Sequence, residues 1–125
     1  MKAHVASIYV RSGDVDDEHL VMVANIGFRG GAIGQVRLKV GEGITGFAAE
    51  CMRPLTMSVE DSHYKYVPDI GEEHYPLYLA MPIVVGRRSE AVLVLQREKG
   101  RPFQDAEVVL GTALSTAFAY ALERA

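Results

Sequence analysis

The stretch LAMPIVVGRRSEAVLVLQ, residues Leu79–Gln96, decides the fold, because it reads as two strands joined by a polar turn. The residues on both sides of GRRSE are almost all apolar, which indicates strands that are largely buried. Leu79–Val85 and Ala91–Gln96 are therefore predicted to form a hairpin of mostly buried type.

Further strands are predicted closer to the amino terminus. Ala3–Val10 and Leu20–Ile26 are rich in β-branched residues and are separated by turn formers and acids, so they are expected to pair antiparallel. Gln35–Val40 alternates polar and apolar residues, as a strand with one buried face does. Leu55–Val59 is predicted to be a further, short strand.

Two segments change to a helical period. In GEGITGFAAECMRP, apolar residues recur at i, i+3, i+4 and i+7 and share one face of a helix: Ile44, Phe47, Ala48 and Cys51. A last helix is expected over Asp105–Arg124, and so much of its circumference is apolar that it must be covered on more than one side. The order of elements predicts an α+β domain, a single antiparallel sheet with helices on its faces.

Size and composition narrow the class of protein. A chain of 125 residues with 49% hydrophobic and 23% charged residues fits one globular domain. No apolar run approaches the ~18 residues of a membrane span, and a net charge of -3 with scattered Lys and Arg argues against nucleic acid as a partner. The start MKAHVASIYV has no secretory signal and Cys51 is the only cysteine, so a cytoplasmic location is expected.

The stretch DSHYKYVPDIGEEHYPLY, Asp61–Tyr78, keeps neither a strand nor a helix period. It holds four of the six tyrosines and two of the four histidines of the chain. Long irregular segments in compact domains are often binding loops, and tyrosine suits small polar ligands because a flat apolar ring ends in a hydroxyl. The alternative is that these aromatic side chains only fill the edge of the sheet.

Several motifs together resemble a GAF domain: VGEGITGFAAE followed by RPL, then SHYKYVPDIGEEHY and YLAMPI, and finally VLVLQRE with RPF before the last helix. Within that family the chain is most similar to the regulatory GAF domains of nitrogen-related phosphoenolpyruvate-protein phosphotransferases. The resemblance implies a GAF-like (profilin-like) fold with five to six antiparallel strands and helices on both faces. It also implies one domain over residues 1–125 that lacks the usual first helix, which would leave the last helix exposed and favour a homodimer through it.

The resemblance further implies that the tyrosine-rich stretch roofs a ligand pocket over the sheet. The predicted ligand-binding residues are five from this stretch and one from the short helix: His63, Tyr64, Tyr66, Tyr75, Tyr78 and Phe47. The expected ligand is a metabolite that reports nitrogen or carbon status, such as glutamine or 2-oxoglutarate, and the expected output is control of an attached phosphotransferase. No cofactor is expected.

Other chemistries fit the sequence less well. His63 and His74 have no third ligand at a metal-binding spacing, and Cys51 reads as a small buried hydrophobic residue. The glycines of VGEGITG could expose amides to an anion, but an abrupt passage from strand to helix needs them equally. The signature of cyclic-nucleotide-binding GAF domains is broken, since Gln96-Arg97 and Glu107-Val108 stand at its places.

No arrangement of residues suggests a catalytic site, so the domain is not expected to be an enzyme. Two alternatives to a sensor stay open. One is a dimerisation module whose vestigial pocket is filled by Tyr66, Tyr78 and Phe47. The other is an enzyme that uses Cys51 or a histidine-bound metal.

Overall fold

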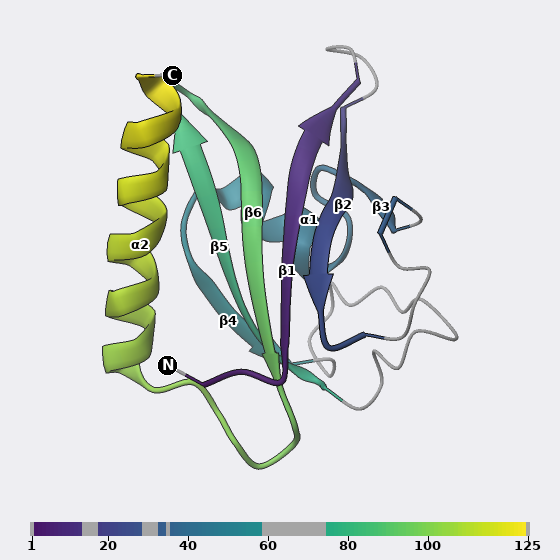
Figure 1. Ribbon diagram of the computed structural model, residues 1–125, viewed down its shortest axis with the longest axis vertical. Helices are drawn as coiled ribbons and strands as arrows, with labels where there is room; N and C mark the ends of the chain where they lie inside the picture. The colour runs from purple at the N-terminus through teal and green to yellow at the C-terminus, as the bar shows by residue number, and fades with distance from the viewer. Residues whose placement is uncertain (1, 14–17, 29–32, 35, 59–74, 125) are drawn as a thin grey trace.

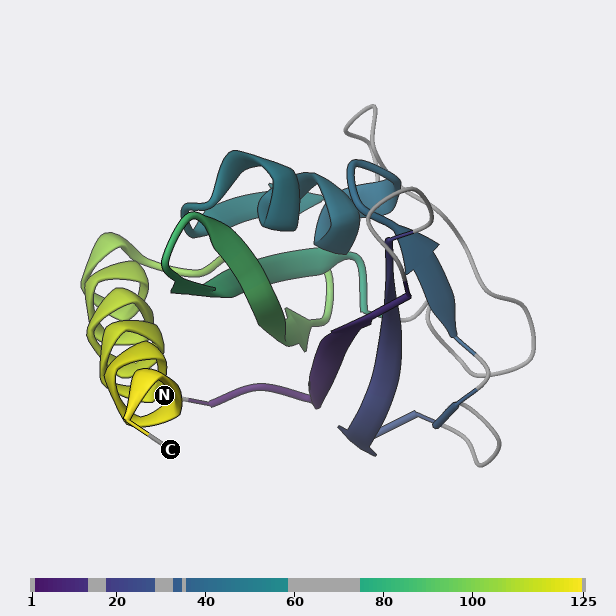
Figure 2. The same cartoon turned by 90° about the horizontal axis from the view of Figure 1, so that it is seen from above.

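The computed structural model describes residues 2–13, 18–28, 33–34, 36–58 and 75–124. Six strands form one antiparallel sheet in the order β3-β2-β1-β6-β5-β4. Helix α1 lies on one face and helix α2 on the other (Figure 1, Figure 2). The predicted α+β architecture, one antiparallel sheet between helices, is confirmed.

Each predicted element is present. Along the chain the elements are β1 (Val5–Ser12), β2 (His19–Ile26), β3 (Arg37–Lys39), α1 (Gly43–Cys51), β4 (Leu55–Ser58), β5 (Leu77–Val85), β6 (Arg88–Arg97) and α2 (Asp105–Glu123). The expected pairing of β1 with β2 is found, and β1 also pairs with β6 in the middle of the sheet. Segments far apart in sequence therefore meet at β1.

The central hairpin turns more tightly than the sequence predicts. Strands β5 and β6 pair from Leu77 opposite Arg97 to Val85 opposite Arg88, so two residues, Gly86 and Arg87, form the turn. Gly86 has a φ of 66°, a conformation that two-residue hairpin turns require and that glycine adopts without strain. The sequence prediction started the second strand too late, because it assigned the polar residues Arg88, Ser89 and Glu90 to the turn although they belong to β6.

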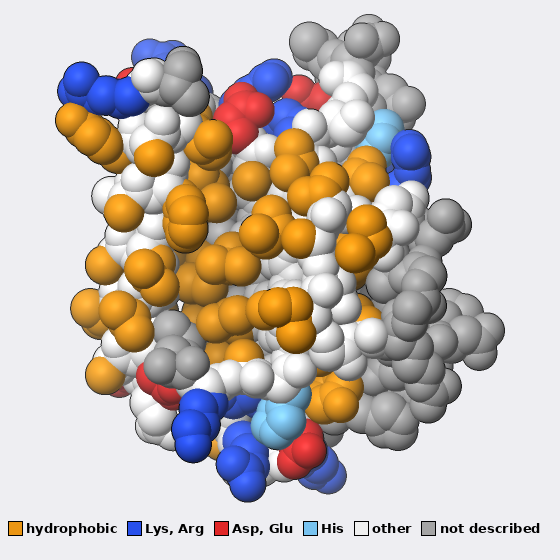
Figure 3. Space-filling model, viewed as in Figure 1, with side chains coloured by type: hydrophobic (Ala, Val, Ile, Leu, Met, Phe, Trp, Pro, Cys, Tyr) orange, Lys and Arg blue, Asp and Glu red, His pale blue; other side chains and the backbone are white. Residues whose placement is uncertain are grey.

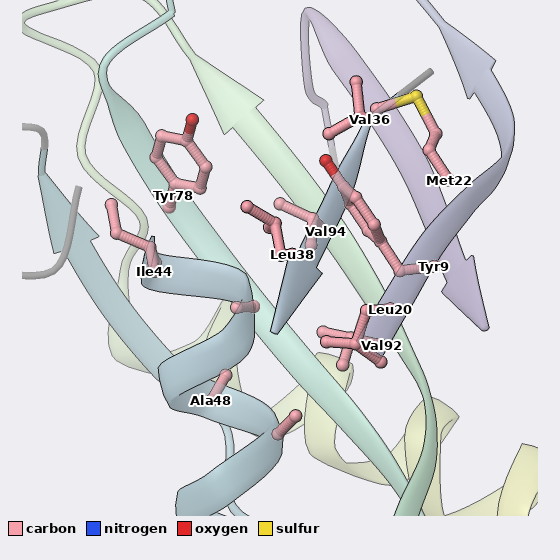
Figure 4. Packing of buried hydrophobic residues seen from close by; sticks show 12 residues of the cluster. Tyr9, Leu20, Met22, Val36, Leu38, Ile44, Ala48, Tyr78, Val92 and Val94 are labelled. Carbon is pink, nitrogen blue, oxygen red and sulfur yellow. The ribbon is translucent and has the colours of Figure 1, made fainter. Parts of the chain in front are cut away.

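Alternation along the strands gives the sheet two unlike faces. The core face, which lies under α1, carries a closed cluster of buried side chains (Figure 4): Tyr9, Leu20, Met22, Val36, Leu38, Ile44, Ala48, Ala49, Tyr78, Ala80, Val92 and Val94. The opposite side is called the α2 face here, and it carries the residues between these, such as Ile8, Val10, Leu79 and Met81.

Helix α1 is buried on more sides than its sequence period predicts. Six of its nine residues are buried, including Thr45, Gly46 and Ala49, whereas Phe47 and Cys51 are half-buried. The predicted apolar stripe was therefore partly wrong. A side chain at position 46 would place its Cβ 2.5 Å from the carbonyl oxygen of Lys39, so only glycine allows the helix to approach the preceding strand this closely.

Helix α2 is long and sparsely covered. Of its nineteen residues, all described, Gly111 and Ser115 are buried. Gly111 brings the helix against β5, because a Cβ there would lie 2.2 Å from Met81 Sδ. The prediction that α2 is covered on more than one side is not met within this chain, since large apolar side chains along it stay exposed: Val109, Leu110, Leu114, Phe118 and Leu122.

Candidate functional site

The structure describes three of the six predicted ligand-binding residues. Tyr78 lies at the start of β5, Tyr75 lies just before this strand, and Phe47 lies on α1. His63, Tyr64 and Tyr66 lie outside the described residues, so their roles stay predictions.

Tyr78 is the best-defined member of the candidate site. Its side chain belongs to the core face and is buried. Tyr9 of β1 is buried on the same face, and Figure 4 shows the two rings on either side of Val94 with their hydroxyl ends pointing the same way. The sequence prediction missed Tyr9, although the alternation of Val5, Ser7 and Tyr9 along β1 was a usable signal.

Tyr75 is held at the end of the sheet. Its ring stacks on His4 with 5.7 Å between the ring centroids, next to the amino end of β1. Its backbone carbonyl oxygen accepts a hydrogen bond of 3.1 Å from Gln96 Nε2. Gln96 is 1% exposed and lies opposite Tyr78 on the core face, a second functional candidate that the sequence prediction missed.

A further polar pair lies on the core face where β1 meets β2. Ser7 is buried, and its hydroxyl accepts a hydrogen bond of 2.8 Å from Asn25 Nδ2. The side-chain oxygen Asn25 Oδ1 in turn accepts a hydrogen bond of 3.0 Å from the backbone amide of Phe28. Together with the tyrosines and Gln96, these groups are neutral hydrogen-bonding side chains. Such an arrangement suits recognition of a polar molecule better than acid–base chemistry.

Backbone amides of the glycine turn before α1 donate hydrogen bonds to carbonyl oxygens of the same chain. The backbone amides of Gly41, Glu42 and Gly46 donate to the carbonyl oxygens of Gly46, Lys39 and Glu42, respectively, at 2.8 to 3.1 Å. These hydrogen bonds favour the role of the glycines in the abrupt passage from strand to helix over a role in binding an anion.

The residues at the broken cyclic-nucleotide signature contact one another on the α2 face. Arg97 binds the Glu107 carboxylate with two nitrogens, and its guanidinium lies 4.1 Å from the centroid of the Phe103 ring. The hydrogen bond from Arg97, followed by one from the backbone of Gln104, lowers the pKa of Glu107 to about 2. This group fastens the start of α2 to the end of β6.

An open cavity of about 780 Å³ lies beside the Arg97–Glu107 ion pair rather than over the core face. Its wall includes Arg97, Gln104 and Glu107. These three bind each other through the ion pair and through a capping box, in which the Glu107 side chain accepts the Gln104 amide at 3.0 Å. These paired groups fix the start of α2, whereas the core face carries the residues that the sequence predicts as ligand contacts and that the structure describes near the entry of β5.

Neither a metal site nor a membrane-spanning helix is found in the described part of the chain. Residues 2–13, 18–28, 33–34, 36–58 and 75–124 contain no group of three His, Cys, Asp or Glu side chains arranged to hold a metal. His63 and His74, which the sequence disfavours as metal ligands, lie outside these ranges. Among the same residues no helix is long and apolar enough to cross a membrane.

The sheet order, the two helices and the candidate site define a known class of domain. The profile described as "GAF domain" matches residues 1–122, and the chain belongs to this family. GAF domains are typically regulatory and ligand-sensing. This agrees with the expected fold and family.

The relatives point to phosphotransferase proteins. The chain is 28% identical over 126 residues to the "Phosphoenolpyruvate-dependent phosphotransferase system" protein of Escherichia coli, with 99% of this chain covered. The match to the protein of the same description from Salmonella typhimurium has the same extent. In both cases the chain spans 17% of the length of the relative.

Solved structures agree with this placement. The GAF domain of a phosphoenolpyruvate-protein phosphotransferase from Coxiella burnetii has a TM-score of 0.82 and 27% identity, covering 98% of this chain and 73% of that one. The corresponding Acinetobacter domain has a TM-score of 0.79, 23% identity and coverage of 99% and 74%. A free methionine-R-sulfoxide reductase from Thermoplasma acidophilum, at 13% identity and a TM-score of 0.76 with 98% and 81% covered, shares the fold alone.

Proposed function

We propose that this GAF domain senses a small polar metabolite that binds at the core face. The observation that carries the proposal is the set of neutral polar side chains buried there: Ser7, Tyr9, Tyr78 and Gln96. Buried polar groups stabilise a core less well than apolar ones of the same shape, so their presence is better explained by recognition than by packing. The tyrosine-rich stretch leads directly into this face through Tyr75.

The proposed ligand reports nitrogen or carbon status, and glutamine and 2-oxoglutarate are the first compounds to test. The proposed output is control of an attached phosphotransferase, which the likeness to phosphoenolpyruvate phosphotransferase proteins supports. The domain itself is proposed to be a non-catalytic regulator that works in the cytoplasm. His63, Tyr64, Tyr66 and Phe47 remain proposed ligand contacts beside Tyr75 and Tyr78.

Isothermal titration and thermal unfolding with each compound test the sensor directly. A ligand that binds the folded state raises the melting temperature, and the rise grows with ligand concentration. Tyr78→Phe, which removes only a hydroxyl, should weaken binding by roughly tenfold, about the value of one hydrogen bond. The matched control is Tyr120→Phe, because Tyr120 is exposed on α2. No heat and no stabilisation at millimolar concentrations of both compounds would contradict this choice of ligands.

A second candidate function, dimerisation, is favoured by the surface of the α2 face. Figure 3 shows apolar side chains that continue from α2 across the neighbouring strands. This apolar surface includes Ile8, Val10 and Val23 on the sheet and Leu110 and Leu114 on the helix, all exposed. A patch of this extent is unusual on a monomer and marks an interaction surface.

The proposed occupant of this surface is a second copy of the chain. A stable interface buries about 800 Å² of each partner, which is roughly a ninth of the 7180 Å² accessible surface of this chain. Two-fold symmetry would place the same apolar surface on both sides of the contact. Sedimentation separates the two functions: a dimerisation module alone forms dimers that do not respond to either metabolite.

A further inference from the structure

Two adjacent residues at the end of β6 reach opposite faces of the sheet. Successive side chains of a strand alternate in direction, so Gln96 points to the core face and Arg97 to the α2 face. Both side chains are at least nine-tenths buried. They are therefore two polar residues, joined by a single peptide group, that are each fixed by partners on their own side.

On the core face, Gln96 holds the chain that enters β5. Its Nε2 donates to the carbonyl oxygen of Tyr75 at 3.1 Å, just before β5 begins at Leu77. Its own backbone carbonyl oxygen accepts the amide of His4 at 2.9 Å, and the His4 ring stacks on Tyr75. The start of β5 is thus tied to β6 by a side chain and to the amino terminus by a ring contact.

On the α2 face, Arg97 holds the start of the helix. Its Nε donates to the carbonyl oxygen of Lys2 at 2.7 Å, and its Nη1 donates to the carbonyl oxygen of Pro102 at 3.2 Å and to Glu107 Oε1 at 2.9 Å. The guanidinium also covers the Phe103 ring. These contacts join the amino terminus, the loop before α2 and its first turn to one side chain.

We infer that the Gln96–Arg97 pair couples the entry of β5 to the start of α2, so that a change at one raises or lowers the local stability of the other. A displaced Tyr75 carbonyl would leave buried Gln96 without its acceptor, and relief of that loss requires the end of β6 to shift. Arg97 moves with it, because both residues share one backbone and both environments are closely packed. As a route from ligand to output, the inference rests on the proposed sensor function, whereas the coupling itself depends only on these contacts.

Amide hydrogen exchange in two variants tests the coupling without a ligand. Gln96→Leu removes the bond to Tyr75 and touches no partner of α2, yet we expect exchange in residues 108–111 to become about tenfold faster, as for a helix start that opens more often. Glu107→Gln weakens the Arg97 ion pair, and we expect faster exchange in residues 77–79 at the entry of β5, where Tyr78 of the core face pairs with Gln96. Coupling between two sites must act in both directions.

Ser7→Ala is the matched control, because it deletes another buried polar contact of the core face, the hydrogen bond between Ser7 of β1 and Asn25 of β2, in which neither Gln96 nor Arg97 takes part. After correction for global stability measured in urea, it should leave exchange in residues 108–111 unchanged. Effects confined to the side of each substitution, or equal effects of Ser7→Ala, would overturn the inference. If Gln96→Leu does not fold, Glu107→Gln still tests the coupling through the exchange of Tyr78, because Tyr78 lies on the core face and Glu107 belongs to α2 on the opposite face.

A final arm adds millimolar glutamine or 2-oxoglutarate to the unchanged protein and to Gln96→Leu. Slower exchange at both residues 77–79 and 108–111 in the unchanged protein, but only at 77–79 in the variant, supports the pair as the route of the signal. If neither compound changes exchange while the variants act across the sheet, the coupling stands and the choice of ligand fails. Slower exchange at both places in Gln96→Leu would overturn the pair as the route.

Discussion

The helices cover the two faces of the sheet to different degrees. On the core face, the nine-residue helix α1 buries six of its own residues and closes a cluster that reaches from β3 to β5. On the α2 face, a helix of nineteen residues buries two and covers mainly β5, which leaves Ile8, Val10 and Val23 exposed. The shorter helix thus contributes more to the core, because burial depends on close approach and not on length.

This difference in coverage favours a different proposed function for each face. The core face combines the buried cluster with the polar side chains proposed to meet a ligand. The α2 face offers the apolar surface proposed to meet a second copy. Substitutions on the two faces should therefore differ in kind: those on the core face alter folding stability or ligand response, and those on the exposed part of the α2 face alter assembly.

The largest expected effect comes from two nearby positions of β2. Leu20→Ala, at a residue that is 0% exposed on the core face, should lower the free energy of unfolding by about 2 to 5 kcal/mol, since it leaves a cavity. Val23→Ala, at a residue that is 49% exposed, should cost less than about 1 kcal/mol. Urea unfolding followed by circular dichroism measures both. Equal losses would mean that the faces are equally buried in solution.

A smaller loss is expected where α2 does approach the sheet. Gly111→Val should lower the free energy of unfolding by about 1 to 3 kcal/mol, because its side chain would collide with Met81 beneath the helix. Ala113→Val adds a similar side chain to an exposed position of the same helix, so it serves as the control and should cost well under half as much. If both variants lose the same amount, α2 does not pack on Met81 as described.

Assembly should respond at the exposed part of the α2 face. Leu114→Glu places a charge in the apolar surface and should raise the dissociation constant of the proposed dimer by about 100-fold, the size expected for a central contact, without a large change in stability. Ile33→Glu, at another exposed apolar residue, is the control and should leave the dimer intact. Analytical ultracentrifugation measures the effect, and a monomer in the unsubstituted protein would refute the surface.

The smallest effect concerns pH. The hydrogen bond from Arg97 lowers the pKa of Glu107 in the folded chain to about 2, from an ordinary value of 4.5. The ion pair therefore adds stability above about pH 4.5, and this contribution is lost as the pH falls from about 4.5 towards 2. The protection of residues 108–111, that is, their exchange relative to the intrinsic rate at each pH, should fall over this range, and Glu107→Gln should remove that dependence. A helix start that opens equally at pH 6 and pH 3 in the unsubstituted protein would contradict the role of the pair.

The strands and helices were predictable because each depends on a local pattern. The apolar runs of β5 and β6 and the changed period at Ile44 place these elements within a few residues. The burial of Phe47 and Cys51 was not predictable from the period, because Gly46 draws another side of α1 against the preceding strand. The family resemblance, which rests on motifs spread over the chain, is confirmed by the GAF domain match.

The candidate site was predictable only in part. Tyr78 was predicted because its stretch is rich in tyrosine, while Tyr9 was missed because it lies in β1, far from that stretch in the sequence. Gln96 and Arg97 could not be paired with Tyr75 and Glu107 from sequence. Those contacts join residues 21 and 10 positions apart. The first depends on the register of β5 against β6, and the second on where the loop after β6 places the start of α2.

The most direct test of the sensor at the core face is a titration of ¹⁵N-labelled protein with glutamine and with 2-oxoglutarate, followed by amide chemical shifts. A ligand that binds at the core face should give saturable shifts that are largest at the core-face residues Tyr9, Tyr78 and Gln96 and smaller at residues 108–111. Shifts that are largest on the exposed part of the α2 face, or no shift with either compound at millimolar concentration, would contradict it.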